Sequence, residues 1–569
     1  MKTITLKKQL LLVALIFFCG VAPSFADDDT SMTLNVEAGT LSSLIPASKM
    51  YKITELKLSG ELNVEDLKVI RRMGACRKSS KDEWYDGHLQ HLDISDAEFV
   101  GDGMFVYYYN NSPTTQTVSF TDRKYLFAGM KSLQTIELPN SMKEIDGSLF
   151  WECSSLVSLT LPSELTSIGV SSLRDCPNLM SIKIDKNNPY YCSDGAILFN
   201  KDKSKIILAK KTLDAYSIPS SVTQIQSYAF AGCNSLVYLT LPSGVTLIGK
   251  SAFYGCSSLR SLTLPSGVTQ IGDWAFFGCS SLESLTLPSG VTQIGELTFF
   301  GCSGLYSLTL PSSVTQIGNH AFSGCSSLKS LTLPSGVTQI GESAFSGCSS
   351  LKSLTLPSSV TQIGERAFFR CSSLRSLTLP SGLTQIEDGT FVGCSSLQSL
   401  TLPSGVTQIG NSAFSGCSSL RSLTLPSGVT QLGNYVFFEC SSLQSIELPS
   451  SLTQIEESAF QYYCTKIETI YSHMTDPLPL RFDKTVMDNA ILYIPKGSYQ
   501  NYVLADYWKE FKNIKEFDPE TAGINNTHST DNTKELSRYA VNGQRLATPA
   551  KGLNIVRYSD GTVKKVMEK

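Results

Sequence analysis

The sequence predicts a repeat solenoid of the α/β type, in which 23-residue units each add one short strand to a parallel sheet. The first observation is a run of ten cysteines from Cys233 to Cys440, each 23 positions after the one before it. The second is a row of ten phenylalanines in the same phase, from Phe230 to Phe437. One unit cannot bury its apolar residues alone, but a stack of units can, so a fixed period of this length predicts stacked coils.

Each unit can be divided into a strand, a turn and an inward plug. In one example, Leu262 and Leu264 alternate with polar residues, which predicts a short half-buried strand. Pro265 has no N–H to donate and is expected to end that strand. Ala275 and Phe276 are expected to form a helical turn that fills the interior of the coil.

The period sets the domain limits. The repeat extends over residues 119–465, with weaker units at both ends and one longer, irregular unit at about 185–218. Residues 27–118 keep only the strand signature, together with an amphipathic helix over 63–73, and are expected to form an N-terminal cap. Residues 466–518 are rich in Tyr, Trp and Phe, which suits a C-terminal cap.

Residues 1–26 are typical of a secretory signal peptide. Lysines precede a short apolar stretch from Leu10 to Phe18, and Ser24-Phe25-Ala26 is a small-x-small cleavage site. A membrane span needs about 20 apolar residues, and no later segment contains an apolar run of that length. Cys19 leaves a lipoprotein signal open, although the bulky Phe18 before it is atypical. We expect an exported chain, secreted or on the cell surface, without a membrane-spanning segment.

The strand signature L-x-x-L-x-L is carried by Leu259, Leu262 and Leu264, and the unit continues as L-P-S-x-V-T-x-I-G-x-x-A-F-x-G-C-S-S. This unit resembles the BspA-like leucine-rich-repeat family of bacterial surface proteins, of the Bacteroidetes type, over about residues 120–465. The resemblance implies a leucine-rich-repeat solenoid on an exported protein. It also implies adhesion to host matrix proteins or to other cells.

The C-terminal residues form a separate module. Residues 519–535 are polar and are expected to be a linker, and 536–569 a small β tail. Apolar residues alternate around Asn542-Gly543 and Asp560-Gly561, two turns that suit β-hairpins. The tail resembles the C-terminal sorting tails of secreted Bacteroidetes proteins, which implies export and surface attachment. The alternative is a plain β appendage.

The cysteine column is expected to hold buried free thiols. A metal site would need paired cysteines or nearby histidines, which the column lacks. Export would permit disulfides, but pairing would split ten equivalent sites into five unequal pairs. A small thiol that fills one packing position explains the column more simply. No metal or cofactor is expected.

Composition and motifs argue against other functions. The net charge is −3, which does not favour a nucleic-acid partner. No catalytic motif is present, so a non-enzymatic binding protein is expected. The alternative is a carbohydrate-active enzyme, or an accessory to one, with a site around Trp84, His91 and Asp93 in the N-terminal cap. A third interpretation is a purely structural surface component.

The residue after the first leucine of each unit forms a column with five positive and one negative residue. The column reads Val237, Arg260, Glu283, Tyr306, Lys329, Lys352, Arg375, Gln398, Arg421 and Gln444. We predict that it binds proteins or anionic glycans of a host or of other cells. The candidate ligand-binding residues are Arg260, Tyr306, Lys329, Lys352, Arg375 and Arg421.

The residue after each Ile-Gly pair, or after the Ile-Glu or Leu-Gly pair that replaces it, forms a second, acidic column. It reads Lys250, Asp273, Glu296, Asn319, Glu342, Glu365, Asp388, Asn411, Asn434 and Glu457. Because Asp, Asn and Glu favour helix N-termini, we expect these side chains to cap the helical turn that follows.

Overall fold

The computed structural model describes residues 30–518, except 79–82, 109–114, 120–123, 146–147, 170–172, 174–175, 457 and 461–462, together with the strands of the C-terminal module. The expected signal peptide, residues 519–534 of the expected linker, both expected hairpin turns of the tail and the column member Glu457 lie outside the described residues.

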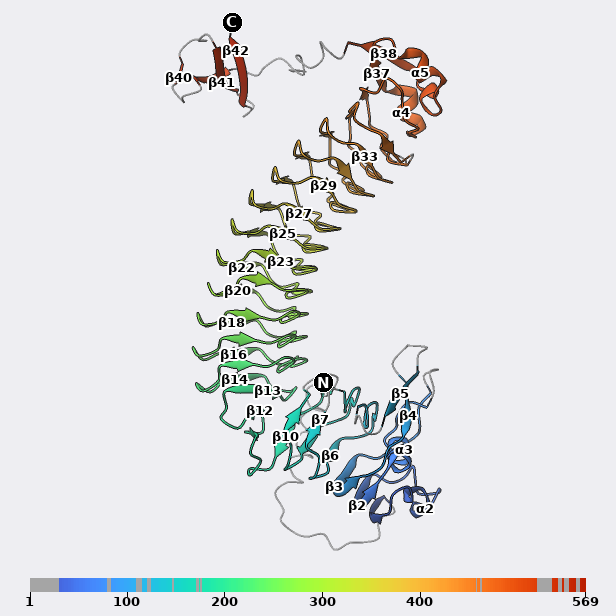
Figure 1. Cartoon of the computed structure of the whole chain (residues 1–569), viewed down its shortest axis with the longest axis vertical. Coiled ribbons are helices and arrows are strands. Elements are labelled where there is room, and N and C mark those ends of the chain that lie inside the picture. The colour runs from blue at the N-terminus through green and yellow to red at the C-terminus, as the bar shows by residue number, and fades with distance from the viewer. Residues whose placement is uncertain are drawn as a thin grey trace, which may run out of the picture.

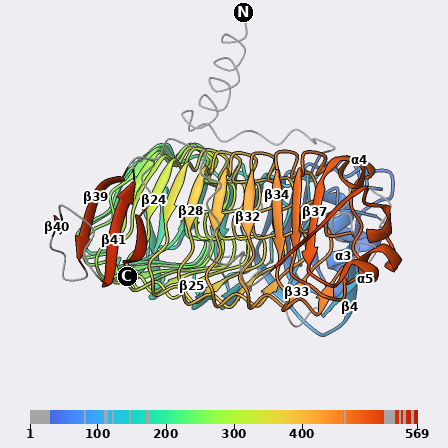
Figure 2. The same cartoon turned by 90° about the horizontal axis from the view of Figure 1, so that it is seen from above.

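The regular coils follow one another along an arc (Figure 1). Each contributes a short strand to a first parallel ladder, built on the Ser-Leu-Thr segment (Figure 2). Leu262 and Leu285 lie in neighbouring strands of this ladder, and Leu285 pairs with Leu308, as the period predicts. Its strands pair in two sheets: β14 (Ala215–Ser217), β16 (Tyr238–Thr240), β18 (Ser261–Leu262), β20 (Ser284–Thr286) and β22 (Ser307–Thr309) in the first, and β24 (Ser330–Thr332), β26 (Ser353–Thr355), β28 (Ser376–Thr378), β30 (Ser399–Thr401), β32 (Ser422–Thr424), β34 (Ser445–Leu448) and β36 (Thr469–Ser472) in the second.

The expectation of one strand per coil is wrong, because the coils also pair along a second parallel ladder. After the Ser-Gly turn the backbone runs along another side of the coil, where its polar groups also need partners. Its strands pair in three sheets: β15 (Gln224–Ile225), β17 (Leu247–Ile248) and β19 (Gln270–Ile271) in the first, β21 (Gln293–Ile294), β23 (Gln316–Ile317), β25 (Gln339–Ile340) and β27 (Gln362–Ile363) in the second, and β29 (Gln385–Ile386), β31 (Gln408–Ile409), β33 (Gln431–Leu432) and β35 (Gln454–Ile455) in the third.

The expected helical turn is also wrong. The residue before each alanine has a positive φ, 62° at Trp274, which breaks a right-handed helix. Its N–H bonds to the next coil instead: Trp274 N donates to the Glu296 carbonyl at 2.9 Å. Phe253 N likewise donates to the Ala275 carbonyl at 2.8 Å. These turns therefore form a third line of bonds between coils.

The core of the regular coils is a stack of phenylalanine rings. The rings of Phe322 and Phe345 lie 5.3 Å apart and nearly parallel, and the stack runs from Phe230 to Phe482. Beside it, all ten column cysteines are buried free thiols, as expected. Each thiol except that of Cys233 also donates to the carbonyl of the phenylalanine 26 residues earlier, as from Cys256 Sγ to Phe230 O at 3.1 Å.

The N-terminal region is a six-stranded parallel sheet with two helices. Asn63 caps the second helix through a capping box with Asp66, which confirms the expected helix. The strands are β1 (Ser31–Val36), β2 (Glu55–Leu62), β3 (His91–Phe99), β6 (Thr135–Glu137), β8 (Ser158–Leu161) and β10 (Ser181–Ile184). The other elements are α2 (Leu41–Leu44), α3 (Val64–Met73), the hairpin of β4 (Met104–Tyr108) and β5 (Thr115–Ser119), and the parallel pair β7 (Glu144–Ile145) and β9 (Ser167–Ile168).

The irregular unit divides the hydrophobic core. Its strands β11 (Tyr191–Ser193), β12 (Ile197–Asn200) and β13 (Lys205–Ala209) pair antiparallel. Leu198 and Leu208 pack in the N-terminal core, whereas Phe199 and Ile206 pack in the core of the regular coils. Strands β12 and β13 thus separate two cores.

Two elements follow the coils. The first ladder continues through β37 (Ile491–Pro495) and β38 (Asn513–Phe517), with α4 (Lys484–Asn489), α5 (Tyr499–Leu504) and a 3₁₀ turn at Trp508–Glu510 packed at its end. Tyr502 and Trp508 are fully buried there, in keeping with an aromatic cap.

The tail is an antiparallel sheet of β39 (Glu535–Ala540), β40 (Arg545–Leu546), β41 (Gly552–Tyr558) and β42 (Val563–Glu568). In the described part of the chain, no helix is long and apolar enough to cross a membrane.

Candidate binding surfaces

The basic column lies directly before the strands of the first ladder, and all six candidate residues are exposed. Three of them occupy consecutive coils: Lys352 N donates to the Lys329 carbonyl at 3.0 Å, and Arg375 N to the Lys352 carbonyl at 3.3 Å. We call Lys329, Lys352 and Arg375 the basic stripe. Their backbones are spaced at the strand separation of about 4.8 Å.

The structure separates the other candidates from the basic stripe. Tyr306 lies in the coil just before Lys329 and is 51% exposed, so it extends the stripe with an aromatic ring. Arg260 lies on the far side of Glu283, whose N–H bonds to the Arg260 carbonyl. Arg421 follows the neutral Gln398, to whose carbonyl its N–H donates at 3.4 Å. The continuous cationic surface therefore covers three coils.

The electrostatics of the basic stripe are unbalanced. Among the residues that the structure describes, none of its three cations forms an ion pair. Like charges on adjacent strands repel, so the arrangement slightly destabilises the free protein. An acidic partner would relieve that repulsion. On either side of each buried leucine, as at Leu354, the first ladder exposes Ser353 and Thr355, which leaves a flat polar surface beside the stripe.

The acidic column does not cap helices, because the turns after it are not helical. Its short members instead accept a bond from the same position of the next coil. Asp273 Oδ1 accepts from Glu296 N at 2.9 Å, and Asp388 Oδ1 from Asn411 N at 2.6 Å. Asn319 and Asn411 make the same bond to the coil after them. The column is thus a ladder of side chain to backbone bonds between coils.

Two hollows lie along the second ladder. The larger encloses about 850 Å³ over β21 to β29, and the other about 580 Å³ over β15 to β21. Asp273, Glu296, Glu342 and Glu387 line the larger one, and no lysine or arginine does. The coils approach closely here: a Cβ atom at Gly318 would lie 2.7 Å from the backbone of Gly295. The recurring Ile-Gly pair was the only sequence signal of these hollows.

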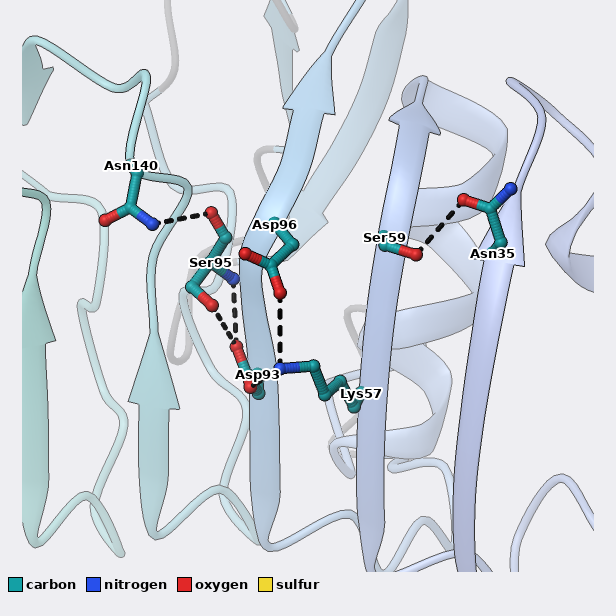
Figure 3. A network of polar contacts seen from close by, with 7 residues as sticks. All are labelled: Asn35, Lys57, Ser59, Asp93, Ser95, Asp96 and Asn140. Carbon is teal, nitrogen blue, oxygen red and sulfur yellow. Dashed lines mark hydrogen bonds and ion pairs between the residues drawn. The ribbon is translucent and has the colours of Figure 1, made fainter.

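The N-terminal cap does not assemble an acid–base pair from its candidates. Asp93 lies 2.9 Å from Lys57 Nζ and accepts from Ser95, while Asp96 lies 3.3 Å from the same ammonium (Figure 3). Burial alone would raise the pKa of Asp93, but the hydrogen bonds from Lys57 and Ser95 hold it below its ordinary value. The carboxylate is therefore a poor proton donor.

The other two candidates in the cap also have structural partners. His91 Nδ1 lies 2.8 Å from Thr135 Oγ1, and the Trp84 ring is covered by Lys131 Nζ, 3.5 Å from its centroid. The described ranges hold no group of three or more His, Cys, Asp or Glu side chains that could bind a metal ion. The network of Figure 3 thus joins neighbouring strands of the sheet.

Stacked 23-residue coils, in-phase leucine strands and a phenylalanine stack define a leucine-rich-repeat solenoid. The family described as the BspA type leucine rich repeat region matches residues 105–207, 201–329, 299–420 and 369–475. The chain belongs to this family.

Two of the similar solved structures are bacterial leucine-rich repeat proteins. A leucine-rich repeat protein from Bacteroides ovatus ATCC 8483 is 25% identical, with a TM-score of 0.45, over 74% of this chain and 100% of that one. A leucine rich cell surface protein from Faecalibacterium prausnitzii A2-165 is 29% identical, with a TM-score of 0.39, over 60% of this chain and 98% of that one. No curated protein matches the chain.

Proposed function

We propose that this protein is an exported, cell-surface adhesin that binds acidic regions of host matrix proteins, anionic glycans or the surfaces of other cells. The observation that carries the proposal is the basic stripe: three exposed cations in consecutive coils without an ion-pair partner among the described residues. The family includes surface proteins, and the signal-like segment at 1–26 supports export.

The mechanism is additive binding by weak contacts on a rigid support. An exposed ion pair contributes about 0.2–1 kcal/mol, so one cation alone binds little. Cations held at a fixed spacing engage a linear or flat acidic partner together, so the translational and rotational entropy of association is lost only once. Such binding weakens as salt rises, because the Debye length falls to about 8 Å at physiological ionic strength.

The test compares the mature chain with a variant in which five cations of the column become serine. The probes are an array of matrix proteins and anionic glycans, heparin included. We expect the variant to bind about tenfold more weakly or worse, with a flatter salt dependence, because several contacts are lost. Its stability should change little, since the side chains lie outside the core. The replaced residues are Arg260, Lys329, Lys352, Arg375 and Arg421.

A matched control removes the same charge elsewhere. Five exposed lysines away from the column are changed to serine, and this variant should bind like the unchanged protein. The control residues are Lys52, Lys143, Lys183, Lys186 and Lys515. Equal losses in both variants would show that net charge, and not the column, drives binding. Unchanged binding of the five-site variant at low salt would remove the column from the mechanism.

A further inference from the structure

The second ladder is interrupted at the irregular unit, as it is between β19 and β21 and between β27 and β29. Strand β9 pairs with β7 on one side only. The next strand of the ladder, β13, pairs on that side with β12 of the hairpin and not with a regular coil. Between β9 and the hairpin lies a hollow of about 900 Å³, which is within the range of about 300–1,000 Å³ for small-ligand sites.

A tyrosine hydroxyl bonds to a backbone carbonyl at the unpaired edge of β9. In most regular coils, the carbonyl equivalent to that of Thr166 accepts from the next coil, as Thr246 O does from Thr269 N at 3.0 Å. Here Tyr191 Oη donates to Thr166 O at 3.2 Å instead. Burial raises the pKa of Tyr191, so its hydroxyl stays a donor at neutral pH. An added peptide strand would have to displace this bond, so the hollow is poorly suited to strand addition.

Aromatic rings and polar groups line the hollow together. Tyr190 is 52% exposed, and Tyr191 and Tyr228 are half-buried. Asp202, also in the lining, is ionised at neutral pH because hydrogen bonds from Ser204 hold its pKa below its ordinary value. Lys205 lines the same hollow and is exposed.

The wall of the hollow is held in place by its own unit. Lys201 Nζ donates to the carbonyls of Lys186 and Asn188, and the Asn188 side chain accepts from Tyr190 N at 2.8 Å. Asn188 Nδ2 in turn donates to Leu165 O at 2.9 Å, next to β9. The exposed ring of Tyr190 is therefore attached to a braced backbone rather than to a free loop.

We propose that this hollow binds a saccharide, with one pyranose ring packed on Tyr190. The C–H groups of a sugar carry partial positive charge and suit the negative face of an aromatic ring. Sugar hydroxyls both donate and accept, and the hollow offers acceptors at Asp202 and Gln226 and donors at Lys205 and the hydroxyls of Tyr190 and Tyr228. The site goes beyond the proposed function, because it belongs to the irregular unit and not to the basic stripe.

The test uses the full mature chain on an array of neutral and uronic-acid-containing oligosaccharides, followed by calorimetry with the best-bound one. Tyr190→Ala should weaken binding about tenfold or more, since it removes the ring. Tyr190→Phe keeps the ring and should retain most of the affinity. Lys205→Met separates the two kinds of sugar, because it should weaken binding of a sugar that carries a carboxylate more than binding of a neutral one.

Two controls make the result specific. Tyr238→Ala removes a tyrosine that is 61% exposed on the first ladder, and it should leave saccharide binding unchanged. The five-site serine variant of the basic column should also bind the saccharide normally, which separates this site from the adhesin proposal. No binding to any saccharide on the array, or equal affinity of the Tyr190→Ala variant, would overturn the inference.

Discussion

In the regular coils each 23-residue unit adds one strand to each of two ladders, whereas the irregular unit adds an antiparallel hairpin and a hollow. The regular coils bury one phenylalanine and one cysteine per unit in a continuous core. The irregular unit holds Tyr190 at the surface and separates two cores with β12 and β13.

The difference shows how a repeat protein divides its tasks. Positions that recur in all or nearly all coils are engaged between coils, as with Phe322, Cys325 and Gly318. Positions that vary, such as Lys329 and Tyr190, lie on the surface and are available to a partner. Repetition therefore builds the support, and departures from it create the candidate binding sites.

The largest expected effect is alkaline unfolding of the regular coils. Burial raises the pKa of Cys302 and Cys371 to about 12, whereas an unfolded thiol titrates at about 8.5. A folded pKa above the unfolded one means that the thiol's contribution to stability is complete below about pH 8.5 and is lost as pH rises towards the folded pKa. The loss is about 1.4 kcal/mol per thiol per pH unit above that point.

Ten such thiols act together in the column, so the reduced protein should unfold steeply between about pH 9 and 10. Far-UV circular dichroism from pH 8 to 11 under reductant measures this. Full native signal at pH 11 after overnight incubation would contradict the buried-thiol column.

Thiol labelling at neutral pH should distinguish the two regions directly. Cys192 of the irregular unit is half-buried, while the column thiols are buried. A buried thiol reacts only when its coil opens. We expect Cys192 to react on the order of a thousandfold faster than Cys325, as read by mass spectrometry of quenched samples. Equal rates would mean that the coils open as readily as the irregular unit.

The phenylalanine stack should be the most sensitive point for a single substitution. Phe322 packs between the rings of Phe299 and Phe345 at 5.6 and 5.3 Å. Phe322→Ala leaves a cavity in the stack and should lower the free energy of unfolding by about 3–5 kcal/mol in urea denaturation. Tyr190→Ala, at the surface of the irregular unit, should change it by less than about 0.5 kcal/mol. Similar losses of unfolding free energy in the two variants would contradict the claim that the phenylalanine stack contributes more to stability than Tyr190.

The side-chain ladder of the acidic column should have the smallest measurable effect. Asp388→Ala removes the bonds to Asn411 N at 2.6 Å and Asn411 Nδ2 at 3.0 Å, and should cost about 1 kcal/mol. Asp388→Asn keeps an acceptor and should recover most of that loss. Glu365→Ala removes an exposed carboxylate of the same column and serves as the control, with a change below about 0.5 kcal/mol.

The register of the first ladder could be predicted from sequence, because Leu262 and Leu264 alternate with polar residues at a fixed period. The second ladder could not, because Gln270-Ile271 is too short to show alternation. The sequence also did not predict the turn at Trp274. Its positive φ lies in the region that glycine prefers, yet the equivalent position of the next two coils holds Leu297 and His320. Their N–H bonds to the next coil, which only the stacked structure supplies, offset the strain.

The two candidate binding sites also differ in how far the sequence could predict them. The basic stripe was visible in sequence because the repeat aligns Lys329, Lys352 and Arg375 without any structure. The hollow at Tyr190 was not, because it depends on how the hairpin of the irregular unit meets β9. A break in the 23-residue period predicts an irregular unit, but it does not predict the structure of that unit.

The most direct test of the central claim, that varied positions on a regular support bind the partner, is footprinting of the heparin-bound protein. Hydrogen exchange and lysine-reactivity mapping would compare the free and bound states coil by coil. We expect protection of Lys329 and Lys352 and of the strands β24, β26 and β28, with unchanged exchange in β16 and β20, where the column holds Val237 and Glu283. Uniform protection along the first ladder, or protection confined to the second-ladder hollows, would contradict the account.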